Sequence, residues 1–236
     1  MPNDYFQFKQ FLVEQDKCAM KVCTDSCVFG AYINVAGAQR VLDIGAGTGL
    51  LSLMVAQRSE ALVDAVEIHP DAQAQATENF AASPWAERLR LHPMPLQQYA
   101  PRQPYEVILS NPPFFLASLK SDSAAKNSAR HTGDLHFGDI LLFAQRHLTS
   151  TGNLYLLLPP AEAAHFQKAA QAYGLYLSET VEVFTYINGK CIRHIQTYGF
   201  APEDSPVTKQ LYIREADKVT YTPEFVELLQ PYYLHL

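Results

Sequence analysis

A chain of 236 residues is long enough to bury one substantial core, and 48% hydrophobic with 18% charged residues is ordinary for a globular protein. It has no apolar run long enough to span a membrane and no basic-then-apolar signal at its start, so we expect one cytoplasmic, monomeric domain over residues 1–236. The net charge of −6 argues against a nucleic-acid binder that is basic overall, but not against local basic clusters.

The cysteines do not form a metal-binding pattern. They stand at Cys18, Cys23, Cys27 and Cys191, and no pair has the Cys-x-x-Cys spacing that is typical of zinc sites. We therefore expect reduced thiols and no bound metal.

The first 30 residues contain two local patterns. Phe6 and Phe8 alternate as in a β-hairpin, although with Phe11 and Leu12 they fit an apolar helical stripe equally well. Residues 27–33 indicate a helix, for which Thr24, Asp25 or Ser26 could serve as the N-terminal cap.

A glycine turn follows. Residues 40–44 read as a buried strand, residues 45–49 as a tight turn and residues 50–56 as the start of a helix. Glycine is suited to such a turn because it takes positive φ and lets a ligand approach the backbone closely. Gly45 and Gly47 fit the first part of a nucleotide-binding turn, and we expect free N–H groups here, but Gly49 falls one place short of the dinucleotide spacing.

The next predicted strand, residues 62–67, ends in an acid. Glu67 stands about twenty residues past the turn, where a carboxylate can accept hydrogen bonds from ribose hydroxyls. The alternative is a solvated strand end. A helix is expected from Pro70 to Asn79, since proline suits a first helical turn.

Short strands are then expected at residues 89–92 and 105–110, and the second leads into Asn111-Pro112-Pro113-Phe114. Ligands of open α/β sheets bind outside the carboxyl ends of the strands, which is where this tetrapeptide stands. Farther along, helices are expected at 137–146 and 161–173, with Gly174 ending the latter, and strands at 153–158, 175–186 and 192–201. Asn188-Gly189 predicts a hairpin turn. Residues 212–236 are expected to contain a further short strand and a last helix that begins near residue 222.

Asp43 to Gly49, Glu67 and the Asn-Pro-Pro-Phe tetrapeptide together resemble the class I S-adenosylmethionine-dependent methyltransferases, in the branch that methylates planar amino groups. Residues 8–11, 18–25, 110–115 and 128–131 extend this likeness, and nearly the whole chain resembles the bacterial tRNA (adenine-N6) methyltransferase family, which modifies adenine 37 of a valine tRNA. The resemblance implies a Rossmann-like, seven-stranded, mostly parallel sheet with a C-terminal antiparallel strand and helices on both faces.

The resemblance also implies a cofactor, S-adenosyl-L-methionine, with residues 1–30 closing over its methionine end. The cofactor-binding residues that it implies are Lys21, Thr24, Asp43, Gly45, Gly47, Glu67 and Asn111. The family commonly has an acid near Leu96 that accepts from the cofactor's adenine amino group, and this chain has none there. Gln97 or a backbone carbonyl could take that part.

The tetrapeptide suits chemistry on an amino group. An adenine amino nitrogen is a poor nucleophile, because its lone pair is delocalised into the ring. The Asn111 side-chain oxygen and the Pro112 carbonyl could accept from its two N–H groups, while Phe114 could stack on the base. No metal or nucleophilic side chain is needed.

Residues 116–135 have the small, polar and basic composition of a mobile substrate loop. This stretch carries a basic cluster that we predict to contact the tRNA, formed by Lys120, Lys126, Arg130 and His131. Further basic clusters stand at residues 9–21 and 190–194.

Three other functions fit parts of the pattern. The same chemistry could act on guanine N2 of ribosomal RNA or on a protein glutamine, although related guanine-modifying families often have His where Phe115 stands. A nicotinamide-dependent oxidoreductase would need a second nucleotide-binding half, which the sequence lacks. A cofactor-binding RNA adaptor without turnover is the third.

Overall fold

We describe the protein from a computed structural model, whose described residues are 3–18, 20–112 and 135–236. The predicted site residues Phe114, Lys120, Lys126, Arg130 and His131 lie outside these ranges, as does most of the predicted substrate loop.

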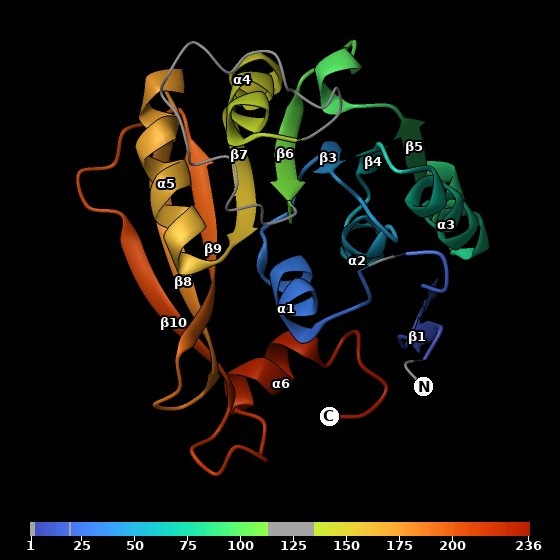
Figure 1. The fold of residues 1–236 in the computed structure, drawn as a ribbon, viewed down its shortest axis with the longest axis vertical. Helices are drawn as coiled ribbons and strands as arrows, with labels where there is room; N and C mark the ends of the chain where they lie inside the picture. The colour runs from blue at the N-terminus through green and yellow to red at the C-terminus, as the bar shows by residue number, and fades with distance from the viewer. Residues whose placement is uncertain (1–2, 19, 113–134) are drawn as a thin grey trace, which may run out of the picture.

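The described part of the chain forms an eight-stranded sheet and a separate two-stranded hairpin (Figure 1). The order across the large sheet is β10 (Val207–Arg214), β8 (Tyr176–Tyr186), β9 (Cys191–Gly199), β7 (Leu148–Leu158), β6 (Tyr105–Ser110), β3 (Arg40–Ile44), β4 (Leu62–Glu67) and β5 (Leu89–Pro93). The strands pair in parallel except where β9 runs antiparallel to β7 and β8. The mostly parallel α/β fold and its C-terminal antiparallel strand are therefore confirmed.

The predicted count of seven strands is wrong by one. The additional strand, β10, pairs in parallel with β8 at the edge of the sheet, with Val207 opposite Glu179. Its first four residues are exposed, so this half of the strand shows no alternation of buried and exposed side chains. The exposed half therefore lacks the periodic signal by which strands are found in a sequence, and the short strand expected after residue 212 overlaps only the last residues of β10.

Helices cover both faces of the sheet, as predicted (Figure 1). They are α1 (Thr24–Tyr32), α2 (Leu50–Arg58), α3 (Pro70–Ala82), α4 (Phe137–His147), α5 (Pro160–Ala170) and α6 (Pro223–Leu229), with 3₁₀ turns at Ala86–Arg88, Leu96–Gln98 and Gln171–Tyr173. One core joins the sheet to α1, α2, α3 and α6, and the other joins it to α4 and α5. Val41 belongs to the first core and Leu42 to the second, because successive side chains of a strand point to opposite faces.

The local turn and cap predictions have mixed outcomes. The hairpin alternative for Phe6 and Phe8 is confirmed, since β1 (Tyr5–Gln7) pairs antiparallel with β2 (Leu12–Glu14). The predicted hairpin is confirmed, since β8 and β9 pair antiparallel, and Asn188 between them has a φ of 67°. The proposed capping of α1 by residues 24–26 is wrong, because Cys23 is the N-cap and makes no side-chain capping bond.

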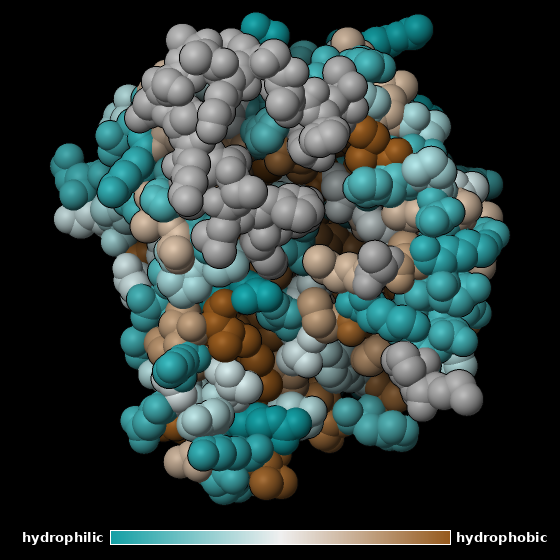
Figure 2. All heavy atoms as spheres, viewed as in Figure 1, coloured by the Kyte–Doolittle hydropathy of each residue, from teal (hydrophilic) through white to brown (hydrophobic). Residues whose placement is uncertain are grey.

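The two ends of the chain pack together beside α2 (Figure 1). The Lys9 N–H donates to the Tyr232 carbonyl at 2.8 Å, and the Tyr232 hydroxyl donates to the Met54 carbonyl at 3.2 Å. Tyr232 is itself part of the core, at 2% exposed. In the space-filling view, apolar side chains are visible mainly in recesses of a largely polar face (Figure 2). Across the described ranges, no helix is both long and apolar enough to cross a membrane.

Gly49 provides a test of how tightly the turn is packed. It has φ 82°, and a Cβ there would lie 2.4 Å from Cε1 of Phe80. Gly37 also has positive φ, at 75°, but a Cβ there would meet no atom within 4 Å. Replacement by alanine should cost about 1–2 kcal/mol at either position from backbone strain. Gly49→Ala should cost roughly 1–3 kcal/mol more, because the core must repack. Urea unfolding of both variants measures this, and equal losses would contradict the packing argument.

Candidate functional site

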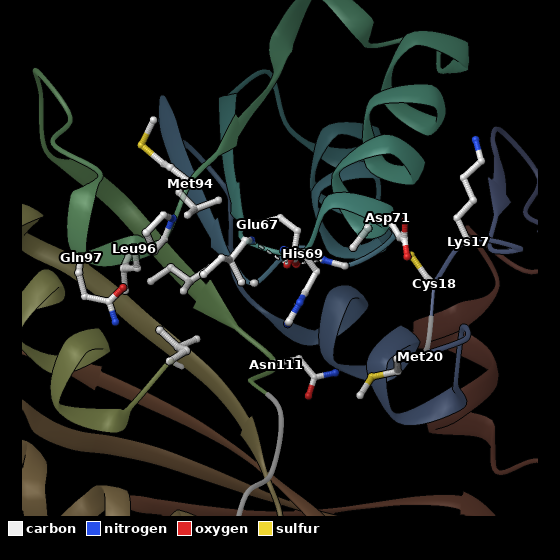
Figure 3. A pocket seen from close by; sticks show the side chains of 18 residues that line it. Lys17, Cys18, Met20, Glu67, His69, Asp71, Met94, Leu96, Gln97 and Asn111 are labelled. Carbon is white, nitrogen blue, oxygen red and sulfur yellow. Dashed lines mark hydrogen bonds between the residues drawn. The ribbon is translucent and has the colours of Figure 1, made fainter. Parts of the chain in front are cut away.

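A cavity of about 440 Å³ opens at the carboxyl ends of β3, β4 and β6 (Figure 3). The residues that line it include Lys17, Cys18, Met20, Gly45, Gly47, Glu67, His69, Asp71, Met94, Leu96, Gln97, Asn111 and Leu135. Parallel strands place their carboxyl ends at one edge of a sheet, so groups far apart in the sequence meet there. The predicted residues Gly45, Gly47, Glu67 and Asn111 are brought together at this cavity.

The sequence predicted free N–H groups at the glycine turn, but three of these groups donate hydrogen bonds within the protein. The N–H groups of Gly45 and Ala46 donate to the Val66 carbonyl at 2.8 and 3.2 Å, and that of Gly47 donates to Glu67 Oε2 at 2.9 Å. The turn instead contributes open space, because a Cβ on Gly47 would meet no atom within 4 Å. Gly45 and Gly47 thus form a cradle that a side chain would fill.

Glu67 ties the end of β4 to this turn. Its carboxylate accepts hydrogen bonds from the N–H groups of Gly47, Ile68 and His69 at 2.8 to 2.9 Å. The residue is buried, at 6% exposed. The three backbone donors replace much of the hydration that the carboxylate loses on burial. A carboxylate has about four lone-pair sites, so Glu67 retains acceptor capacity on the wall of the cavity.

Asp43 lies beneath the turn and is absent from the cavity lining. Its Oδ2 accepts from the N–H and the hydroxyl of Ser52 at 3.2 and 2.7 Å, which fastens the first turns of α2 to β3. Its Oδ1 is buried and has no hydrogen-bond partner within the described residues. Burial raises the pKa of this carboxyl to about 7, with the Ser52 hydrogen bonds opposing the shift.

Asn111 follows β6, and a contact from α1 orients its amide. Its Nδ2 donates to Oγ of Ser26 at 3.0 Å, a contact between residues 85 positions apart. Its Oδ1 is buried and, within the described ranges, accepts no hydrogen bond. Pro112 is buried directly after it. The amide therefore presents an unused acceptor beside the cavity, with its donor side held in place.

The N-terminal segment contributes Lys17, Cys18 and Met20 to the lining, as Figure 3 shows. Two buried amides of α3 hold it there. Gln75 accepts from the Lys17 N–H at 2.9 Å, and Asn79 bonds to both the N–H and the carbonyl of Glu14. Sequence reasoning missed Gln75 and Asn79, because polar residues on a helix resemble its solvated face until the buried partner is known.

Cys18 lies in the cavity but is not an activated nucleophile. Burial, followed by the nearby negative charges of Glu67, Asp16 and Asp71, raises the pKa of its thiol to about 11. The thiol is thus protonated at neutral pH.

Lys21 and Thr24 lie apart from the residues that line the cavity. Lys21 Nζ donates to the Asn3 carbonyl and to Asp4 at 3.2 and 3.3 Å, whereas Thr24 lines a second groove. Their contact with a cofactor remains a prediction, as does the closing of residues 1–30 over it.

Residues 94–97 form one wall of the cavity, which is apolar except for Gln97. This is the stretch in which the family commonly has an acid and this chain has none. Gln97 lines this wall, and its Nε2 donates to Oδ2 of Asp139 from α4 at 2.8 Å. A carboxylate thus lies behind the wall, contributed by a residue 42 positions later in the chain. Within the described ranges, no group of three potential ligands could hold a metal ion.

The shifted pKa of Asp43 predicts how stability depends on pH. Because the pKa lies near 7 in the folded protein against an ordinary value of 3.8, the folded state retains a proton that the unfolded chain releases. The free energy of unfolding should therefore fall as pH rises from about 4 to 7, by at most about 1.4 kcal/mol per pH unit. In Asp43→Asn the free energy of unfolding should no longer fall in this way. Urea unfolding of both proteins at pH 5 and pH 7.5 measures the difference. An equally steep decline in both proteins would mean that another group titrates.

The chain is similar to known methyltransferases in sequence. Residues 18–165 match the family described as the methyltransferase small domain. Proteins named tRNA1(Val) (adenine(37)-N6)-methyltransferase from Cytophaga hutchinsonii and Dyadobacter fermentans are 45% and 44% identical to this chain, over 100% and 98% of both sequences respectively.

Solved structures support the same fold. A predicted O-methyltransferase from Agrobacterium tumefaciens aligns with a TM-score of 0.66 at 19% identity, over 88% of this chain and 96% of that one. The glycopeptide N-methyltransferase MtfA, solved in complex with S-adenosyl-L-methionine, aligns with a TM-score of 0.56 at 12% identity, over 75% and 94%. With the fold, the site and the full-length sequence matches in agreement, this chain belongs to the tRNA1(Val) (adenine(37)-N6)-methyltransferase family.

Proposed function

We propose that this protein transfers a methyl group from S-adenosyl-L-methionine to N6 of adenine 37 in a valine tRNA. The observation that carries the proposal is the Asn111 amide, whose Oδ1 is buried and unpaired among the described residues while Ser26 holds its Nδ2. A buried acceptor without a partner is costly, so a site that retains one is suited to a ligand that donates to it. The names of the full-length relatives support the N6 amino group of adenine as that donor, rather than the N2 amino group of guanine or a glutamine amide.

The cavity fits the proposed cofactor. Gly45 and Gly47 leave room against the backbone, and Glu67 offers acceptor capacity to ribose hydroxyls. Ile44, Val66 and Leu96 provide apolar surface for an adenine ring, with Gln97 at its edge. When bound, S-adenosyl-L-methionine supplies an electrophilic methyl group on a sulfonium.

The chain's own contribution is to orient the amino group. The Asn111 Oδ1 and the Pro112 carbonyl accept from the two N–H groups, which directs the nitrogen lone pair toward the methyl donor. Proline has no N–H and a fixed φ, so it keeps this turn rigid. Catalysis by positioning and electrostatics needs no nucleophile, in keeping with the protonated thiol of Cys18.

The target adenine must leave its stack to reach an acceptor at the end of a strand, and flipping is least costly in a single-stranded loop. Phe114 is proposed to stack on the flipped base, and Lys120, Lys126, Arg130 and His131 to contact the tRNA backbone.

Glu67→Ala tests the cofactor site. The variant should lose roughly 1–3 kcal/mol of S-adenosyl-L-methionine binding free energy, because a charged acceptor is removed from the ribose. It should also lose stability, since three backbone donors become unpaired. Calorimetric titration measures the affinity and urea unfolding the stability. A destabilised variant with wild-type affinity would remove Glu67 from the cofactor site.

Asn111→Ala tests the chemistry. It should slow methyl transfer by roughly 10²–10³-fold in single-turnover assays on an anticodon stem-loop, if its acceptor is worth as much as one oxyanion-hole donor. RNA affinity should change little, because phosphates supply most of it.

The control for this experiment is an RNA that carries purine in place of the target adenine, which has no amino group to methylate. Transfer to that RNA would exclude N6 as the acceptor, and a wild-type rate in Asn111→Ala would reduce the tetrapeptide to a structural turn.

A further inference from the structure

A second groove, of about 330 Å³, lies between the first turn of α1 and the edge of the sheet where β8 and β10 end and β9 begins. Its polar lining consists of Thr24, Asp25, Thr185, Arg193, Arg214 and Tyr221. Among the described residues it shares none with the cofactor cavity. It is therefore a separate site, and Figure 1 shows α1 beside the sheet edge that forms it.

The groove lies close to the proposed catalytic amide, because two consecutive residues contact one and the other. Asp25 forms its wall, and Ser26, the next residue, accepts from Asn111 Nδ2 at 3.0 Å. The Asp25 carboxylate accepts from the Ser26 N–H through Oδ1 and pairs with Arg193 Nε at 2.8 Å through Oδ2. A group bound in the groove would thus lie one residue away from the contact that orients Asn111.

The lining of the groove carries more positive than negative charge, because Arg193 and Arg214 stand against the single carboxylate of Asp25. Asp25 neutralises Arg193, but Arg214 donates to the Val219 carbonyl and to the Tyr221 hydroxyl, which are both neutral. Hydrogen bonds from Thr220 and Val219, and to a smaller extent the charge of Arg214, lower the pKa of the Asp217 carboxyl, so this carboxylate offsets part of the Arg214 charge. Lys218 does not line the groove, but its Nζ lies 4.7 Å from the centre of the ring of Tyr186, which follows the groove residue Thr185 in the chain. In a protein with a net charge of −6, such a site favours an anion at this one place.

The arrangement favours a phosphate over a nucleobase. Tyr221 stacks on Phe225 at 4.7 Å between ring centres, and the Arg214 guanidinium lies 4.5 Å from the Tyr221 ring centre. The ring is thus already packed against two neighbours, whereas the exposed hydroxyls of Thr24 and Thr185 can donate to phosphate oxygens.

We propose that this groove binds a backbone phosphate of the substrate RNA next to the flipped adenine, with Arg214 as the principal charge. The inference rests on the proposed function, because that function supplies the RNA. It assigns a phosphate contact to the C-terminal half of the chain, independent of the basic cluster at residues 120–131.

The test compares three variants with the wild-type protein in binding an anticodon stem-loop RNA at several salt concentrations. Arg214→Gln removes the charge, and Arg214→Lys retains it without the bonds to Val219 and Tyr221. Arg146→Gln removes an exposed arginine from the last turn of α4 and is the matched control. Arg214→Gln should bind roughly fivefold more weakly, with a salt slope lower by about 1, while the other two variants retain the wild-type slope.

Methyl transfer separates this inference from the proposed function. At saturating RNA, Arg214→Gln should still transfer methyl to the target adenine, with unchanged cofactor affinity. If the salt slope of Arg214→Gln is unchanged, or if that of Arg146→Gln changes equally, the groove does not bind an RNA phosphate. Methyl transfer to adenine in the same assays would still support the proposed function. A reduced slope in a protein that methylates no tRNA adenine would instead overturn the function and leave the groove an RNA site.

Discussion

The Glu67 carboxylate, which accepts three backbone hydrogen bonds at the end of β4, is the constraint on which the cavity at the strand ends depends. It joins two neighbouring parallel strands, because one donor comes from the turn after β3 and the other two follow β4 itself. A buried carboxylate is tolerated in a core only when donors surround it, so the glycine turn and the acid stabilise each other. The same group then faces the cavity, which links the stability of the turn to ligand binding.

A second set of contacts surrounds the first turn of α1. Ser26 orients the Asn111 amide, and Asp25 pairs with Arg193 of β9. Helix α1 therefore connects the proposed methyl-transfer position to the second groove, where β8 and β10 end. An RNA that contacts both regions would approach along this edge, with its target base at Asn111.

The family membership also explains the irregular spacing of the glycine turn. Gly49, which departs from the dinucleotide spacing, packs against Phe80 of α3 and does not line the cavity. The proposed cofactor has no pyrophosphate, so the turn does not need to point its N–H groups outward, and those of Gly45, Ala46 and Gly47 donate within the protein. The Gln97 and Asp139 pair similarly supplies polar groups at a wall from which the expected acid is missing.

The sequence by itself determined most of the strands, the turns and the residues at the strand ends, but not the exposed first half of β10. Alternating or continuous apolar runs, glycines at positive φ and an acid or amide after a strand are local signals, and parallel strands bring their ends to one edge. It also predicted Glu67 and Asn111 as site residues. Only the tertiary structure decided which partners these residues have: Ser26 with Asn111, Asn79 with Glu14, and Gln97 with Asp139. Such pairs join positions 42 to 85 residues apart, and a polar side chain carries no sign of its partner until folding buries both.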